Sequence, residues 1–168
     1  IRVIYDKYFS TEEGKWGGYV DKHLIPRLNG FELLMAPYAM AHLKMDLLLR
    51  ETGYKRRRKA GERFRFYLTN ALEEPPVSSE ELAFAYELSR EASQAGDIKR
   101  DAPVMVVLGN PPYSGHSANK GEWIGGMLEV YKKEPGTDQP LKERNPKWIN
   151  NDYVKFLRYG EYLISRTS

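Results

Sequence analysis

Cysteine is absent from the 168 residues, which excludes disulfides and thiolate-bound metals within this chain. This absence is typical of proteins in the reducing cytoplasm. The histidines, His23, His42 and His116, are scattered and lack carboxylates at metal-ligand spacing, so we assign no metal. No apolar run approaches the roughly 20 residues that a membrane-spanning helix needs. We therefore expect a cytoplasmic protein with no membrane partner.

Basic and acidic residues nearly balance, so the net charge is only +3. A value this small does not by itself argue for a nucleic-acid partner. Basic residues are nevertheless concentrated at Lys55 to Lys59, with Arg63 and Arg65 close behind. Two interpretations of this basic run stay open, a solvated loop and a segment that contacts phosphate. For Lys120, Lys155 and Arg158 a solvated surface is the favoured interpretation.

One apolar segment, Val104 to Leu108, has the sequence of a buried strand. Its five residues lack the polar alternation of a half-exposed strand, and the run stops at Gly109. Prolines fix their own φ and restrict the residue before them, so the residues that follow should form a rigid loop. These residues are Asn110, Pro111, Pro112 and Tyr113.

Elsewhere, apolar spacing and turn residues predict a series of helices and short strands. Gly14 to Gly18 is expected to be a loose segment between two helices. A capping box at 78–81 should start a helix that ends at Gly96. The predicted helices are 1–10, 19–28, one that begins at Pro37 and stops at Gly53, 82–96, and 152–164 with Asp152 as a candidate cap. The predicted strands are 31–35, 64–68 and 104–108.

Alternation of helices and strands predicts an α/β protein with helical crossovers and a mostly parallel sheet. Glu32, Asn70 and Asn110 each fall at or just past the carboxyl end of a predicted strand. Ligands bind beyond this edge in such sheets. We therefore expect these three side chains to face one crevice.

The sequence Asn110-Pro111-Pro112-Tyr113 resembles the NPPY catalytic motif of methyltransferases that modify amino groups with S-adenosylmethionine. The asparagine form is associated with adenine N6. Residues 30–49, 67–73, 110–124 and 145–158 also resemble the methyltransferase region of large single-chain restriction-modification enzymes. The resemblance implies a partial Rossmann-like fold over 1–168, with a helical lead-in at 1–29, a βαβαβ core at 30–113, and a loop and C-terminal helix at 114–168.

Site residues follow from the resemblance at matching positions. Asn110, Pro111, Pro112 and Tyr113 match the catalytic motif, with Tyr113 stacking on an adenine that is flipped out of double-stranded DNA. Glu32 matches the carboxylate that accepts hydrogen bonds from the cofactor ribose. Asn70 stands near the position that meets the cofactor adenine.

The family's glycine-rich cofactor motif has no match here, and the first strand of the sheet belongs to that motif. Residues 1–10 resemble the helix that follows it, so we expect a fragment of a longer protein. The remaining partners would then be the nuclease, translocase and target-recognition regions of the parent chain. Two alternatives stay open: transfer to a protein glutamine or an RNA guanine amino group, and a noncatalytic DNA-binding fragment.

Overall fold

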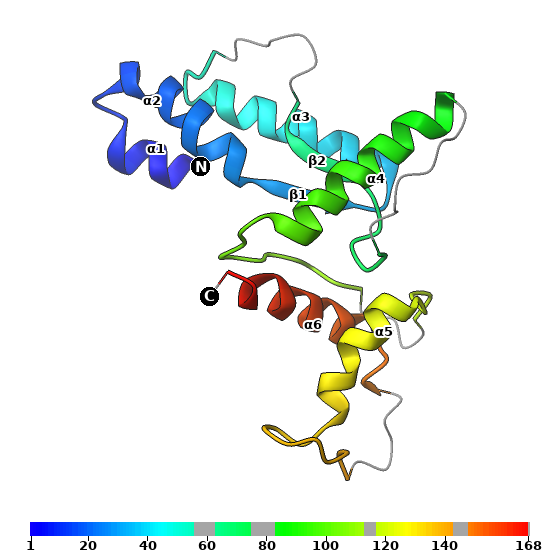
Figure 1. The fold of residues 1–168 in the computed structure, drawn as a ribbon. Helices are drawn as coiled ribbons and strands as arrows, with labels where there is room; N and C mark the ends of the chain where they lie inside the picture. The colour runs from blue at the N-terminus through cyan, green and yellow to red at the C-terminus, as the bar shows by residue number, and fades with distance from the viewer. Residues whose placement is uncertain (56–62, 75–82, 113–116, 143–147, 168) are drawn as a thin grey trace. The chain divides into compact units, whose positions relative to one another are not determined.

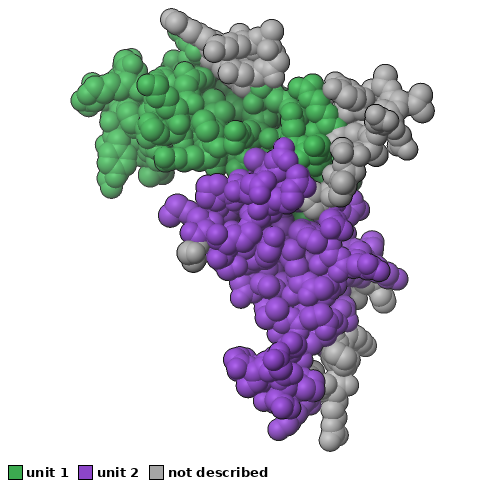
Figure 2. Space-filling model, in the orientation of Figure 1, with its two compact units in different colours: residues 1–71, 81–95 green, residues 72–80, 96–168 purple. Residues whose placement is uncertain are grey.

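The computed structural model describes residues 1–55, 63–74, 83–112, 117–142 and 148–167 (Figure 1). The chain divides into two compact units, which Figure 2 colours separately. Unit 1 consists of residues 1–71 and 81–95, and unit 2 consists of residues 72–80 and 96–168. The predicted capping box at 78–81 lies outside the described residues.

Unit 1 begins with helices α1 (Arg2–Tyr8) and α2 (Glu13–Tyr19). A π-helical turn, Val20–Leu24, and a 3₁₀ turn, Ile25–Arg27, continue directly from α2. The helices expected at 1–10 and 19–28 are therefore confirmed, although the second is not a regular α-helix. The prediction of a loose segment at Gly14 to Gly18 is wrong, because these residues form most of α2.

Trp16 explains why this glycine-rich segment is helical. Its side chain is 2% exposed and packs against Tyr5 and Phe9, with ring centroids 5.3 and 5.2 Å away. Burial of a large aromatic side chain outweighs the low helix propensity of glycine, about 1 kcal/mol per residue relative to alanine. Trp16 is the centre of the unit 1 core, whose other buried members are Val20, Leu24, Leu49, Tyr54 and Phe64.

The sheet of the described residues has two parallel strands, β1 (Asn29–Glu32) and β2 (Arg65–Leu68). Asn29 is opposite Arg65, and Glu32 is opposite Leu68. Helix α3 (Met35–Glu51) connects the strands and ends before Gly53, whose φ of +75° suits glycine. The predicted α/β alternation is confirmed for this strand–helix–strand unit, but β1 shares only Phe31 and Glu32 with the strand predicted at 31–35.

Helix α4 (Ala83–Asp101) continues past Gly96, where the sequence predicts its end. In unit 2, α5 (Glu122–Leu128) and the following 3₁₀ turn (Glu129–Lys132) were not anticipated. The last helix, α6 (Asp152–Ser165), is confirmed, but its cap is Asn151, whose side chain accepts a hydrogen bond from the Tyr153 backbone. Ile124 and Leu128 of α5 and Leu163 of α6 are buried in unit 2.

The prediction of a buried strand at Val104 to Leu108 is wrong. These residues have no strand assignment, and Met105 and Leu108 are 82% and 93% exposed. The physical reason is the lack of a neighbour: in the parts of the chain that the structure describes, only β1 and β2 pair into a sheet. An extended segment needs a partner for its backbone hydrogen bonds before it becomes a strand.

Thr52 offers a direct test of the unit 1 core. Its Oγ1 accepts a hydrogen bond from Trp16 Nε1 at 2.8 Å and donates one to the Leu49 carbonyl at 2.7 Å. We predict that Thr52→Val lowers the free energy of unfolding by about 1–3 kcal/mol, because a buried indole N–H loses its acceptor. Urea denaturation measures this. Thr52→Ser keeps the hydroxyl and is the control; equal stability of the two variants would refute the role of the hydrogen bond.

Lys99 predicts a pH dependence of stability. It is 2% exposed, and its Nζ donates to the Glu73 carbonyl at 2.9 Å. Burial lowers its pKa from 10.5 to about 8, against the opposing effect of the Glu73 charge. Below pH 8 both folded and unfolded states hold the proton; above it the folded state releases the proton first. The lysine's contribution to the free energy of unfolding therefore rises between about pH 8 and 10.5.

The matched variant is Lys99→Met, which has no titrating group at this position. We predict that the free energy of unfolding increases more steeply with pH for the wild type than for this variant between pH 8 and 10. Urea titrations at several pH values measure both slopes. Parallel slopes would show that the pKa of Lys99 is the same in the folded and unfolded states.

Candidate functional site

The structure brings Glu32 and Asn70 to the same edge of the unit 1 sheet. Glu32 is the last residue of β1, and the Thr69 backbone N–H donates to its carbonyl at 2.8 Å. This hydrogen bond extends the pairing one residue past β2 and leaves Asn70 as the next residue along the chain. The expectation that both residues follow the carboxyl ends of adjacent parallel strands therefore agrees with the structure.

The Glu32 carboxylate is half-buried and fixed on one side. Its Oε1 accepts a hydrogen bond from the Leu34 backbone N–H at 3.0 Å, in the turn that leads into α3. Oε2 makes no hydrogen bond to the residues that the structure describes. A carboxylate held in this way can still accept a hydroxyl hydrogen from a ligand.

A second carboxylate, which the sequence did not single out, holds the end of β2. Glu91 of α4 accepts the Leu68 backbone N–H at 3.1 Å through Oε2, and the Tyr38 hydroxyl at 3.1 Å through Oε1. Arg63 forms an ion pair with the same carboxylate. Nothing in the local pattern distinguishes Glu91 from the surface charges of an ordinary helix, so sequence reasoning had no signal for it.

Arg63 and Arg65, close behind the basic run, are both hydrogen-bonded to other residues of unit 1. Arg63 is engaged by Glu91 and by Gln94, whose Oε1 lies 3.0 Å from its guanidinium, and Arg65 donates to the Pro26 carbonyl at 3.1 Å. Residues 56–59 of the basic run lie outside the described residues. Both interpretations of the run remain predictions.

The candidate catalytic residues belong to unit 2, whereas Glu32 and Asn70 belong to unit 1. Asn110 and Pro112 are exposed and Pro111 is half-buried, so the Asn110 amide is accessible to a ligand. Tyr113 lies outside the described residues. The segment before Asn110 contacts the end of α6, because the Val104 backbone N–H donates to Thr167 Oγ1 at 3.0 Å.

Lys155 is not at the surface, contrary to the sequence-based interpretation. It is 4% exposed, beside Asp152, which is 5% exposed. Arg158 is half-buried and donates from Nε to the Met127 carbonyl at 2.9 Å, while Lys120 is exposed as expected. The available signal was the spacing of Asp152 and Lys155, three residues apart at the start of a helix, which allows an ion pair.

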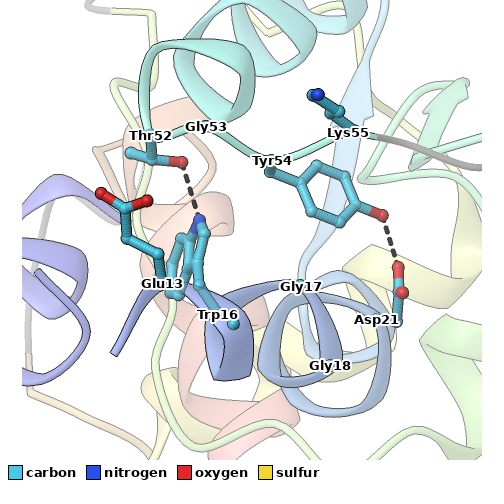
Figure 3. Close-up of a pocket in the computed structure, with 10 residues that line it drawn as sticks. Glu13, Trp16, Gly17, Gly18, Asp21, Thr52, Gly53, Tyr54 and Lys55 are labelled. Atoms are coloured by element: carbon cyan, nitrogen blue, oxygen red, sulfur yellow. Dashed lines mark hydrogen bonds between the residues drawn. The ribbon is translucent and has the colours of Figure 1, made fainter. Parts of the chain in front are cut away.

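A pocket of about 380 Å³ in unit 1 lies away from the predicted site residues (Figure 3). Two hydrogen bonds join residues that line it: Trp16 donates to Thr52, and Tyr54 donates to Asp21. Four of the side chains that line it are therefore bonded to one another in pairs. It is lined by Glu13, Gly14, Trp16, Gly17, Gly18, Asp21, Thr52, Gly53, Tyr54 and Lys55.

Within the described ranges, no group of His, Asp or Glu side chains is placed to hold a metal ion. None of the helices described there has the length and apolar character to cross a membrane. Comparisons with protein-family models, with curated proteins and with solved structures found no match to this chain.

Proposed function

We propose that this chain is part of a restriction-modification methyltransferase that transfers a methyl group from S-adenosylmethionine to adenine N6 in DNA. The observation that carries the proposal is the Asn-Pro-Pro sequence at 110–112, which follows the apolar segment Val104 to Leu108 and has Asn110 exposed. The carboxylate of Glu32 at the carboxyl edge of β1 supports it. Within the proposal the fold is a partial Rossmann-like domain, of which the strand–helix–strand unit β1–α3–β2 is one part.

Asn110 and Pro111 have the groups that an exocyclic amine requires. The adenine amino nitrogen is a poor nucleophile because its lone pair is delocalised into the ring. The side-chain oxygen of Asn110 and the carbonyl oxygen of Pro111 accept the two amino hydrogens, which directs the lone pair out of the ring plane. Acceptors fixed in advance also stabilise the positive charge that develops on this nitrogen. Pro111 and Pro112 restrict the backbone that presents them.

Glu32 fits the ribose of the cofactor, because Oε1 is held by Leu34 and Oε2 remains able to accept a hydroxyl hydrogen. Asn70, next to the residue that bonds the Glu32 carbonyl, would contact the cofactor adenine. When bound, the cofactor supplies the electrophilic methyl group. Residues 56–59 and the remaining regions of the parent protein would contact the double-stranded DNA, and Tyr113 would stack on the flipped base.

The glycine-rich cofactor segment would come from the parent protein and supply a strand beside Val104 to Leu108. The exposed apolar side chains of this segment support that part of the proposal, since Met105, Val106 and Leu108 are 72% or more exposed. A new strand would bury these side chains and pair their backbone groups. Burial of one such side chain stabilises by about 1.5–3 kcal/mol.

We predict that Asn110→Ala in the full-length protein lowers kcat for adenine methylation by a factor of about 10² to 10³. The loss corresponds to removal of one preorganised hydrogen-bonding group, about 2.7–4 kcal/mol of transition-state stabilisation. The measurement is transfer of labelled methyl groups to duplex DNA. Asn150→Ala removes another exposed asparagine of unit 2 and serves as the control. An unchanged kcat for Asn110→Ala would exclude the proposed role.

We predict that Glu32→Ala weakens S-adenosylmethionine binding by a factor of about 10 to 150, because hydrogen bonds to a charged group contribute about 1.5–3 kcal/mol. Glu32→Gln keeps one acceptor oxygen, so its dissociation constant for S-adenosylmethionine should lie between those of Glu32→Ala and the wild type. Calorimetric titration gives the dissociation constants. Thermal unfolding measures how far loss of the hydrogen bond to Leu34 lowers the stability of each variant. Glu51→Ala, at an exposed carboxylate of α3, is the control. Equal affinity of all four proteins would rule out Glu32 as the ribose acceptor.

A noncatalytic DNA-binding fragment is the second candidate function. It is favoured by the absence of a glycine-rich cofactor motif from the sequence and by the lack of a sheet partner for Val104 to Leu108 among the described residues. The two functions differ in one measurable property, since only the first requires S-adenosylmethionine binding by the full-length protein.

A further inference from the structure

The end of β2 is held from two sides just before Asn70. The Thr69 backbone N–H donates to the Glu32 carbonyl of β1 at 2.8 Å. The Leu68 N–H, one residue earlier, points to the opposite side, because successive amides of an extended strand alternate in direction. It donates to Oε2 of Glu91 on α4 at 3.1 Å. Two consecutive backbone amides next to Asn70 are therefore fixed, one by a strand and the other by a helix.

The Glu91 carboxylate is itself held by neighbouring side chains. Its Oε1 accepts a hydrogen bond from the Tyr38 hydroxyl at 3.1 Å and forms an ion pair with Arg63. Arg63 also donates to the Tyr38 hydroxyl oxygen at 3.0 Å and to Gln94 Oε1 at 3.0 Å. The Glu91 side chain is only 13% exposed. A carboxylate this deep is tolerated when it is paired and hydrogen-bonded, and these contacts provide both.

These contacts join three elements around one backbone amide. Tyr38 belongs to α3, Gln94 belongs to α4, and Arg63 comes two residues before β2. Well-packed apolar side chains in place of a buried ion pair are often as stabilising, so stability alone does not account for the group. A charged acceptor adds a directional, charge-assisted hydrogen bond to the Leu68 amide. This hydrogen bond fixes the end of the strand relative to α4.

We infer that Glu91 is a positioning residue, which holds the end of β2 so that Asn70 meets the cofactor adenine. This inference rests on the proposed methyltransferase function. Glu91 acts through the Leu68 backbone, two residues before Asn70, and all three residues belong to unit 1. The hydrogen bond from Thr69 to Glu32 restrains the same strand end from the side of the proposed ribose acceptor. Binding groups work best when they are held within about 0.5 Å of the productive geometry.

The test is a double-mutant cycle between Glu91→Ala and Asn70→Ala in the full-length protein, with the dissociation constant for S-adenosylmethionine as the readout. Loss of one neutral hydrogen bond predicts binding weaker by about 2- to 12-fold for Asn70→Ala. Glu91→Ala should weaken binding by up to the same factor, and should add little in the Asn70→Ala background, because both changes remove the same contact. A wild-type affinity for Glu91→Ala, or an equal loss in both backgrounds, would overturn the positioning role.

Two further variants separate positioning from stability. Glu91→Gln has nearly the volume of the carboxylate and should show the same non-additivity with Asn70→Ala, by a smaller factor. Asp97→Ala removes another carboxylate of α4, which is exposed and paired with Arg100, and should bind as the wild type does. A general loss of folded protein would weaken binding equally in both backgrounds and would count against the inference. A loss for Asp97→Ala as large as that for Glu91→Ala would also overturn it.

Hydrogen exchange needs no cofactor, so it separates failure of the positioning role from failure of the proposed function. Glu91→Ala should accelerate exchange of the Leu68 amide, which loses its acceptor, and of the Thr69 and Asn70 amides that follow. Asp97→Ala should leave all three unchanged. Unchanged exchange at Thr69 and Asn70 in Glu91→Ala would overturn the inference even if the full-length protein binds S-adenosylmethionine. Faster exchange there, together with a wild-type protein that does not bind S-adenosylmethionine, would refute the methyltransferase proposal and with it the positioning role.

Discussion

The interpretation of Asn110 depends on the contacts between the preceding segment and helix α6. The preceding segment, Val104 to Leu108, has no paired strand beside it among the described residues, so it cannot take its position from a sheet. Val104 instead bonds to Thr167, just past α6, and Val107 packs against Gly160 of α6. The structure therefore places the exposed Asn110 after a segment that contacts this helix, and within the proposed function these contacts would limit the motion of the acceptors.

Both units use a charged side chain, partly buried in unit 1 and buried in unit 2, to hold backbone near a candidate residue. In unit 1, Glu91 accepts the Leu68 N–H at the end of β2, two residues before Asn70. In unit 2, Lys155 holds the Asn119 carbonyl on the downstream side of Asn110. In each case a helix supplies the charge and a loop or strand end supplies the backbone group. Charge-assisted hydrogen bonds are suited to this because they are stronger and shorter than neutral ones.

Elements governed by local sequence could be predicted. Helices α3 and α6 lie where their apolar spacing predicts them and β2 where its alternation predicts it, whereas β1 shares only Phe31 and Glu32 with the predicted strand. The paired strands still place Glu32 and Asn70 at one edge, as predicted. The segment 104–108 could not be placed correctly, because a strand depends on a neighbour that local pattern does not reveal.

Tertiary packing explains the other differences. Trp16 makes a glycine-rich segment helical by entering the core, although its neighbours favour a loop. Lys155 was expected at the surface because lysine is almost never fully buried unless it is paired. Its partners, Ser117 and Asp152, are 38 and 3 residues away in sequence, so only the fold shows the complete group. The same holds for Glu91, whose partners come from α3 and β2.

The most direct measurement is the chemical identity of the methylated product. The full-length protein is incubated with deuterium-labelled S-adenosylmethionine and duplex DNA, and the DNA is digested to nucleosides for mass spectrometry. The amine geometry proposed for Asn110 and Pro111 predicts label in N6-methyl-2′-deoxyadenosine. Label confined to protein glutamine, to RNA or to the carbon of cytosine, or no label in any acceptor, would contradict it.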